Sequence, residues 1–172
     1  MNITAMYFSG TGTTKKVTAA IADELTEIKD SRDETAAGEN PGNIKAGIKP
    51  WQRADDIDFT PPAARQEIYR FTTDDLVVFG VPVIAGRVPN VLLKFLDTLQ
   101  GGGALAVPVV IYGNRNFDDA LIELRNILQD RGFYAIGAAA FIGEHSFSRI
   151  LAAGRPDSSD MELSRDFARK LA

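Results

Sequence analysis

The chain has no cysteine among its 172 residues, which narrows the chemistry that it can carry. Without thiols it can form no disulfide, no cysteine-ligated zinc site, no thiol nucleophile and no iron–sulfur cluster. Redox chemistry in this chain therefore requires a bound organic cofactor. Histidine is almost as scarce: His145 is the only one, and neither it nor Glu144 has the spacing of a metal site.

Positive charge and long apolar runs are also in short supply. Lysine and arginine number 19 against 23 acidic residues, a formal net charge of −4. Non-specific binding to nucleic acid needs clustered basic side chains, so none is expected. No apolar run reaches the roughly 18 residues of a membrane span, and the segment from Met1 to Met6 is typical of a strand. We expect a cytoplasmic protein without a membrane partner.

Hydrolytic signatures are missing as well. The sequence contains no Ser–His–acid arrangement and no G-x-S-x-G segment, so acyl transfer has no support. Three pairs of adjacent carboxylates lie at expected element boundaries, where helix caps and solvated turns explain them. They are Asp55-Asp56, Asp74-Asp75 and Asp118-Asp119. We therefore assign no catalytic residue and no metal ligand.

What the sequence does contain is an alternation of strand and helix signals. Ile3 to Phe8 is a short apolar run, and from Thr13 apolar residues recur at helical spacing. Later apolar runs bounded by turn signals are typical of strands buried on both faces. Further strands are expected at Ile57–Thr60, Asp75–Val83, Leu105–Tyr112 and Phe133–Ile142, the last of them broken by Gly137. Further helices are expected from Pro89, at Asp118–Arg131 and at Met161–Leu171.

These elements predict the α/β class, with a doubly wound five-stranded parallel sheet and helices on both faces. We expect a single domain over residues 1–172. A long irregular insertion is expected at about residues 30–56, where the chain is polar and rich in glycine and proline. Trp51 lies in this insertion, where it either anchors the loop to the core or caps a ligand.

The strongest local signal is the segment of residues 9–14, SGTGTT, between the first strand and the first helix. Its glycines allow a tight turn, its hydroxyls add donors, and a helix start presents free N–H groups with a positive dipole end. Such a loop can cradle a phosphate. It is neither a Walker A loop nor G-x-G-x-x-G, since Lys15 holds the third glycine position. The alternative interpretation is a Ser/Thr-rich helix cap with two turn glycines.

The segment Tyr7–Thr14 resembles the FMN-phosphate loop of flavodoxins. Four further segments match too, and together they make the chain similar to the flavodoxin-like half of proteins that fuse such a domain to a bacterial two-cluster ferredoxin. These segments are Gly80–Pro89, Tyr112–Asn114, Phe141–Phe147 and Ala153–Pro156. The resemblance covers most of the chain outside residues 30–56, and the ferredoxin half is absent.

The resemblance implies a flavodoxin-like fold with strand order 2-1-3-4-5 and an FMN beyond the carboxyl ends of the strands. Three loops would hold this cofactor, after the first, third and fourth strands. The cofactor-binding residues predicted in this way are Ser9, Gly10, Thr11, Gly12, Thr13, Thr14, Val83, Ile84, Ala85, Gly86, Arg87, Gly113, Asn114, Arg115 and Phe117. Ile84 stands where an aromatic residue is common, and it has no π face to offer the flavin ring.

Several of these residues have more than one possible role. Gly86 either lets a backbone carbonyl turn towards the flavin N5 or serves a simple turn. Arg87 balances a reduced flavin, docks a partner, or pairs with a surface carboxylate. Phe117 either stacks on the ring or packs as a staple of the helix that begins near Asp118. His145 either lies at the rim of the site as a proton donor or partner contact, or satisfies a local hydrogen bond.

Three functions are compatible with this sequence. The leading prediction is a flavoprotein for electron transport, in which FMN passes single electrons between a donor and a redox partner protein such as a separate ferredoxin. The alternative is an NAD(P)H-dependent quinone-type flavin reductase, an oxidoreductase that needs a second pocket. The third is an interaction module of the same fold without flavin. The sequence leaves the oligomeric state open.

Overall fold

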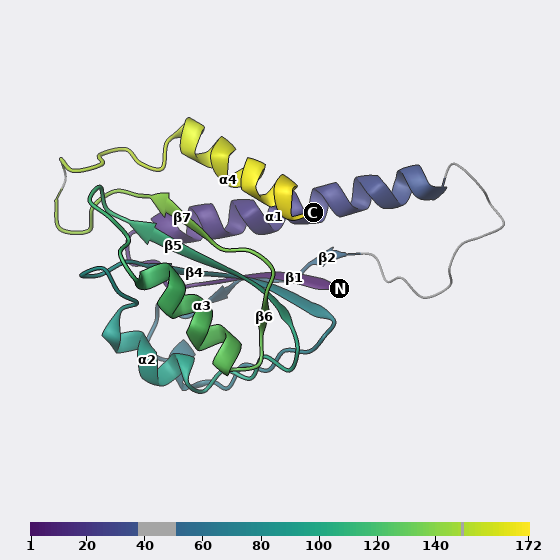
Figure 1. Cartoon of the computed structure of the whole chain (residues 1–172), viewed down its shortest axis with the longest axis horizontal. Helices are drawn as coiled ribbons and strands as arrows, with labels where there is room; N and C mark the ends of the chain where they lie inside the picture. The colour runs from purple at the N-terminus through teal and green to yellow at the C-terminus, as the bar shows by residue number, and fades with distance from the viewer. Residues whose placement is uncertain (38–50, 149) are drawn as a thin grey trace.

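A parallel sheet forms the centre of the molecule (Figure 1). The computed structural model describes residues 1–37, 51–148 and 150–172. The long strands are β1 (Asn2–Tyr7), β4 (Asp75–Pro82) and β5 (Leu105–Tyr112). β4 lies between the other two and pairs in parallel with both. The predicted doubly wound, parallel α/β class is confirmed.

Two short strands fill each edge of the sheet. β2 (Gln52–Arg53) and β3 (Ile57–Asp58) both pair with β1, while β6 (Tyr134–Ala135) and β7 (Ala139–Ile142) both pair with β5. Among the described residues the sheet thus has seven strands in the order β2-β1-β4-β5-β6, with β3 also beside β1 and β7 also beside β5. The prediction of five strands numbered 2-1-3-4-5 is wrong in count and numbering, because two segments share each edge position.

The break expected at Gly137 in the strand Phe133–Ile142 is confirmed, because the segment forms two separate strands, β6 and β7. A Cβ placed on Gly137 would collide with the side chain of Leu171 from the last helix. The Ile136 N–H still donates to Ala106 O of β5 at 3.0 Å, and after it the strand pairing is interrupted until Ala139. The end of that helix therefore occupies the place where a continuous strand would carry side chains.

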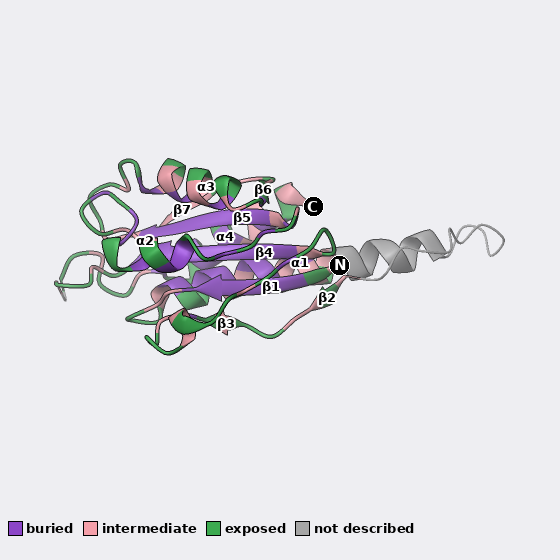
Figure 2. Cartoon of the chain, turned by 90° about the horizontal axis from the view of Figure 1, so that it is seen from below, coloured by how far each residue is buried: buried purple, intermediate pink, exposed green. Residues whose placement is uncertain are grey.

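Helices cover both faces of the sheet. α1 (Thr13–Ala37) and α4 (Ser158–Leu171) lie together on one face, and α2 (Asn90–Leu96) and α3 (Ala120–Asp130) lie on the other (Figure 1). A short 3-10 helix, η1 (Ala64–Gln66), follows β3. The long strands are the most continuously buried part of the chain (Figure 2).

Alternation along β4 shows why its apolar run is continuous. Val77, Phe79 and Val81 pack with the core on the α2 and α3 side, whereas Leu76 and Val78 pack with the core under α1 and α4. All five side chains are fully buried. Burying an apolar side chain of this size contributes about 1.5–3 kcal/mol, so a strand with both faces covered favours apolar residues at every position.

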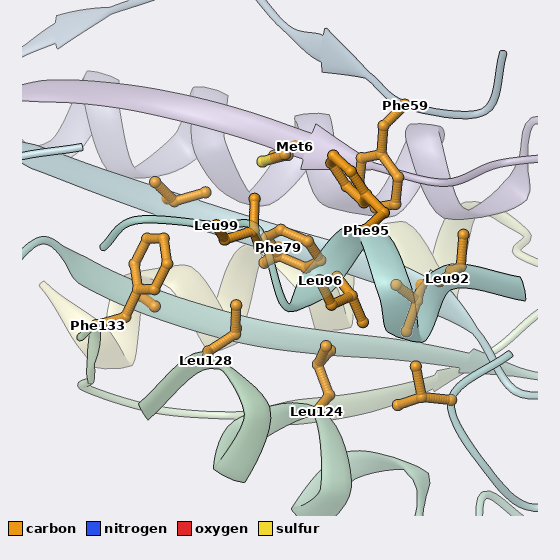
Figure 3. Packing of buried hydrophobic residues seen from close by; sticks show 14 of the residues in the cluster. Met6, Phe59, Phe79, Leu92, Phe95, Leu96, Leu99, Leu124, Leu128 and Phe133 are labelled. Atoms are coloured by element: carbon orange, nitrogen blue, oxygen red, sulfur yellow. The ribbon is translucent and has the colours of Figure 1, made fainter. Parts of the chain in front are cut away.

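Three phenylalanines pack together in the core on the α2 and α3 side of the sheet (Figure 3). The ring of Phe59 lies 5.3 Å from that of Phe79 on β4 and 4.9 Å from that of Phe95 on α2. Phe59 comes directly after the two-residue strand β3. This aromatic contact ties a short edge strand to the centre of the molecule, where two pairing residues alone would hold it weakly.

The irregular segment predicted at about residues 30–56 begins and ends in regular structure. α1 runs to Ala37 and β2 begins at Gln52, so the predicted bounds were too wide; residues 38–50 lie outside the described residues. Trp51 packs against the core under α1 and α4, and the neighbouring Gln52 N–H donates to Met1 O at 3.0 Å. This confirms Trp51 as an anchor, because it lies at the amino end of β1, far from the carboxyl ends that would hold a ligand.

Candidate functional site

A cavity of about 650 Å³ opens at the carboxyl ends of the central strands. Parallel α/β sheets bind ligands at this edge, and small-molecule pockets typically measure about 300–1,000 Å³. The lining comes from the segments that follow β1, β4, β5 and β7. It consists of Phe8, Gly10, Thr11, Thr13, Thr14, Pro82, Val83, Ile84, Ala85, Gly86, Ile111, Gly113, Arg115, Asn116, Glu144, His145, Ser146 and Phe147.

Residues 10–14, at the start of α1, lie beside this cavity, and we call them the amide loop. Their N–H groups donate no hydrogen bond to the described part of the chain. Gly12 has a φ of +86°, and a Cβ on Gly10 or Gly12 would meet no atom within 4 Å. The hydroxyls of Thr11 and Thr13 lie 3.2 Å apart. Free donors at a helix N-terminus bind phosphate and other anions, and this loop is open enough to admit one.

Three hydrogen bonds hold the amide loop in this shape. The Ser9 N–H donates to Thr60 Oγ1 at 2.8 Å, and Ser9 Oγ accepts the N–H of Lys15 at 3.0 Å. The N–H of Lys16 donates to Gly12 O at 3.1 Å and begins the helical pattern. Ser9 is therefore a structural residue of the loop, and its hydroxyl is already engaged.

The two lysines after the loop are engaged with other groups. Lys15 Nζ lies 5.9 Å from the centre of the Tyr7 ring, and Lys16 Nζ donates to Pro156 O at 3.1 Å. Burial raises the pKa of Tyr7 above its usual value. The attraction for an anion at the loop thus comes from the amides and the helix dipole.

A tight turn at the end of β4 forms the next wall of the cavity. The N–H groups of Ile84 and Arg87 each donate to the other residue's carbonyl, at 3.0 and 3.1 Å. Ala85 and Gly86 between them have φ values of +52° and +76°. Positive φ at both central residues defines a type I′ turn. The turn presents Ile84, 45% exposed, at the edge of the cavity.

Gly86 lies directly against the following loop. A Cβ there would lie 2.5 Å from Asp118 Oδ2, so only glycine fits this contact. The Gly86 carbonyl accepts the N–H of Asp119 at 3.1 Å. Turning that carbonyl towards a ligand would break this bond, so the predicted reorientation carries a cost in this chain.

The loop after β5 is held by its own side chains and by a close neighbour. Asn116 Oδ1 accepts the N–H groups of Phe117 at 2.7 Å and Asp118 at 3.3 Å. A Cβ on Gly113 would lie 2.9 Å from the Cα and Cδ2 atoms of His145. The absence of a side chain at Gly113 therefore lets the segment after β7 reach the cavity.

That segment contributes four consecutive lining residues, Glu144 to Phe147. His145 Nδ1 accepts the N–H of Phe147 at 3.1 Å, and the two rings meet edge to face with centroids 6.2 Å apart. His145 thus satisfies a local hydrogen bond and also lies on the cavity, while its role as a proton donor or partner contact stays a prediction.

Most residues predicted to bind the cofactor do lie together on the cavity. These are Gly10, Thr11, Thr13, Thr14, Val83, Ile84, Ala85, Gly86, Gly113 and Arg115. Ser9, Gly12 and Asn114 belong to the same loops without forming part of the lining. Arg87 and Phe117 point elsewhere.

Arg87 is bound to Glu123 on α3. Its Nε and Nη2 atoms donate to the two carboxylate oxygens at 2.9 and 2.7 Å, and the Val88 N–H donates to the same carboxylate at 2.8 Å. The Arg87 guanidinium, aided by that N–H, holds the pKa of Glu123 below its usual value. The interpretation of Arg87 as the partner of a surface carboxylate is confirmed, and its assignment to the cavity is wrong.

Phe117 packs inwards. Its ring lies 5.7 Å from that of Tyr112 and against the core on the α2 and α3 side. A side chain that fills the core cannot also face a ligand in the cavity, so its assignment to the lining is corrected as well.

The sequence analysis missed eight lining residues. They are Phe8, Pro82, Ile111, Asn116, Glu144, Ser146, Phe147 and, as a binding residue, His145. Pro82 and Ile111 stand at the last positions of β4 and β5, where position alone could have indicated them. The others lie within or beside segments that carried the family resemblance.

Two absences hold for the described part of the chain. No group of three or more His, Asp and Glu side chains lies close enough to hold a metal ion. No described helix is both long and apolar enough to cross a membrane.

No protein-family model and no curated protein sequence matches the chain. Solved structures do match along its length. An NADH:FMN oxidoreductase in its apo form aligns with a TM-score of 0.61 at 18% identity, over 99% of this chain and 87% of that one. A flavodoxin of Streptococcus pneumonia TIGR4 aligns at 0.59 and 15%, over 99% and 97%. A flavodoxin from the domain Archaea aligns at 0.52 and 13%, over 99% of both chains.

Identities this low establish the fold alone. The chain therefore has a flavodoxin-like fold, as the sequence predicted. At the carboxyl ends of its strands it has an open cavity beside a loop of amides without partners in the described chain.

Proposed function

We propose that the chain binds FMN in this cavity and serves as an electron-transfer protein. Bound FMN supplies reversible one- and two-electron redox chemistry, which the side chains of this protein do not offer. The observation that carries the proposal is the amide loop: its N–H groups have no partner in the described chain, and four of its five residues line the cavity.

The residues present suit both ends of the cofactor. The amides of residues 10–14 and the hydroxyls of Thr11 and Thr13 offer donors to a phosphate dianion, and Gly10 and Gly12 leave room for it. The rest of the cavity is bounded by the Ile84 turn and the loop after β5, which would hold the flavin ring through backbone groups and apolar contacts. A volume of about 650 Å³ is that of a small-molecule site.

We further infer that the electrons pass to or from a separate protein. The resemblance to the flavodoxin half of flavodoxin–ferredoxin fusions makes a ferredoxin the expected partner. A location in the cytoplasm stays a prediction from the sequence. The likeness in fold to an NADH:FMN oxidoreductase keeps a reductase as the alternative outcome of the test below.

Thr13→Asp tests the phosphate end of the site. The substitution places a negative charge in the first turn of α1, where it suits the helix dipole but repels a phosphate. We expect FMN affinity to fall at least about 10-fold while affinity for riboflavin, which lacks the phosphate, stays within about twofold. Isothermal titration of the purified apoprotein measures both constants.

Two controls sharpen this experiment. Thr13→Asn has the shape of the aspartate without its charge, and Asn90→Asp adds the same charge at the start of α2, away from the cavity. Both should bind FMN far better than Thr13→Asp. Wild-type protein that binds no FMN, or that binds FMN and riboflavin equally well, would contradict the proposal.

The holoprotein then separates carrier from enzyme. A carrier should oxidise NADH or NADPH negligibly by itself and exchange electrons rapidly with a reduced ferredoxin in stopped-flow absorbance. Steady NADH or NADPH oxidation by the protein alone would instead identify a reductase.

A further inference from the structure

Phe147 is 87% exposed, the largest exposed fraction among the large apolar side chains that the structure describes. Yet it does not stand on a distant surface, because it lines the cavity together with His145. Exposing a phenyl ring to water is unfavourable, so covering it is favourable. A bulky ring at the edge of a ligand cavity is therefore suited to being covered when a ligand binds.

The backbone that carries Phe147 is well ordered by hydrogen bonds. The N–H of Glu144 donates to Arg155 O at 2.9 Å and that of His145 to Leu151 O at 3.2 Å. Ser148 Oγ in turn accepts the N–H of Leu151 at 3.2 Å. The exposed ring thus projects from a fixed turn.

His145 supports the ring from the side. Because its Nδ1 accepts the Phe147 N–H, the imidazole is held edge to face against the phenyl, with centroids 6.2 Å apart. The imidazole also lies against Gly113 in the neighbouring loop. This contact leaves a face of the Phe147 ring available for a second, flat ring.

The other aromatic rings near the cavity are engaged elsewhere. Phe8 lies 6.3 Å from Phe59 in the core and has the Arg65 guanidinium over it at 5.6 Å. Phe117 packs on Tyr112. Ile84, on the turn after β4, has no π face. Of the two phenyl rings in the described lining, Phe8 is half-buried in these contacts, and Phe147 is the exposed one that a planar ligand can cover.

We propose that Phe147 is the aromatic side chain that stacks on the isoalloxazine ring, held in place by His145, and that the segment after β7 supplies the wall that the Ile84 turn lacks. This inference rests on the proposed binding of FMN. Stacked aromatic pairs are favourable beyond the apolar area that they bury, so the ring should matter for affinity.

Phe147→Ala, Phe147→Leu and Phe147→Trp test this assignment, with Ile150→Ala and Ile150→Trp as matched controls. Ile150 is 86% exposed in the same region but does not line the cavity. We expect Phe147→Ala to bind FMN about 10-fold more weakly and Phe147→Leu to recover only part of this loss, with both altering the visible circular dichroism of the bound flavin. Because the side chain is exposed, melting of the apoprotein should not change.

Phe147→Trp makes the contact directly visible. An indole in contact with the flavin quenches its fluorescence by electron transfer, so bound FMN should have a shorter fluorescence lifetime than in wild type, at an affinity close to wild type. Ile150→Ala and Ile150→Trp should change neither affinity nor lifetime.

The outcomes distinguish the two proposals. Wild-type protein that fails to bind FMN would defeat the proposed function. Wild-type protein that binds FMN while Phe147→Ala binds equally well, or while Phe147→Trp and Ile150→Trp show the same lifetime, would overturn the role of Phe147 and leave the proposed function standing.

Discussion

Gly80, near the carboxyl end of β4, decides how closely α1 lies on the sheet. A Cβ at this position would lie 2.9 Å from Thr14 Cγ2 and even nearer to Thr18 Oγ1. Both threonines are buried, and the Thr18 hydroxyl donates to Thr14 O at 2.7 Å, so neither can move without breaking a contact. Thr14 ends the amide loop, and the absence of one methyl group therefore also sets where the loop opens.

Gly80→Ala should destabilise the protein by about 1–3 kcal/mol, the range for overpacking a filled core. Urea unfolding followed by circular dichroism measures the change. Gly10→Ala is the matched control, because a Cβ there meets no atom within 4 Å, and its effect should stay within about 0.5 kcal/mol. Equal stabilities of the two variants would show that α1 does not pack against β4 as described.

At the scale of the element, hydrogen bonds and an ion pair at the start of α4 hold its cap together and connect it to the segment after β7. Asp157 accepts the N–H of Asp160 at 3.0 Å, and Asp160 accepts the N–H of Asp157 at 2.9 Å, a reciprocal capping box. Arg155 forms an ion pair with Asp160, which is 4% exposed, and lies 3.6 Å from Asp157. The Arg155 carbonyl also receives the N–H of Glu144, so this cap helps to position the segment that carries Phe147.

Asp160→Asn should lower the free energy of unfolding by about 2 kcal/mol at pH 7, since a buried, charge-assisted hydrogen bond is lost. Arg155 holds the pKa of Asp160 below its usual value. A carboxyl group with a lowered folded-state pKa contributes its stability above the unfolded pKa of about 3.9 and loses it as the pH falls through the folded value. The difference from wild type should therefore shrink below about pH 4.

Chemical denaturation between pH 3 and pH 7 checks this expectation. Asp166→Asn on the same helix is a suitable control, because its pair with Arg169 is exposed and such pairs contribute at most about 1 kcal/mol. A difference for Asp160→Asn that does not depend on pH would argue against the ion pair with Arg155.

At the scale of the whole molecule, the parallel sheet brings distant segments to one edge. All strands run in the same direction, so the segments after β1, β4, β5 and β7 meet at the carboxyl ends, although they lie far apart in sequence. No residue at the amino ends of the described strands lines the cavity; Trp51 packs against the core there. A ligand in the cavity would touch four segments at once, so its binding should stabilise the entire fold.

FMN should accordingly raise the melting temperature. A ligand at 100 times its dissociation constant stabilises the folded state by about 2.7 kcal/mol, which corresponds to about 5–10 °C for a domain of this size. Differential scanning calorimetry of the apoprotein with and without FMN measures the shift. Riboflavin at the same concentration should produce a smaller one. An unchanged melting temperature at saturating FMN would contradict a site built from all four segments.

The sequence by itself determined most of the elements and the open loop at the start of α1. The apolar run from Asp75 to Val83 became β4, and the run Leu105–Tyr112 became β5, because burial on both faces requires apolar residues without interruption. The SGTGTT segment became an open loop at a helix start, since glycine conformation and free helical N–H groups are local properties.

Only the tertiary structure decided what each side chain faces. Leu171 of α4 is the side chain that lies against Gly137, Glu123 holds Arg87 away from the cavity, and Gly113 makes room for His145 and hence for Phe147. Each of these outcomes depends on a contact between residues more than 30 positions apart. The periodicity of a sequence indicates which residues are buried but not which distant residues they contact. The position of Phe147 on the cavity was therefore apparent only from the tertiary structure.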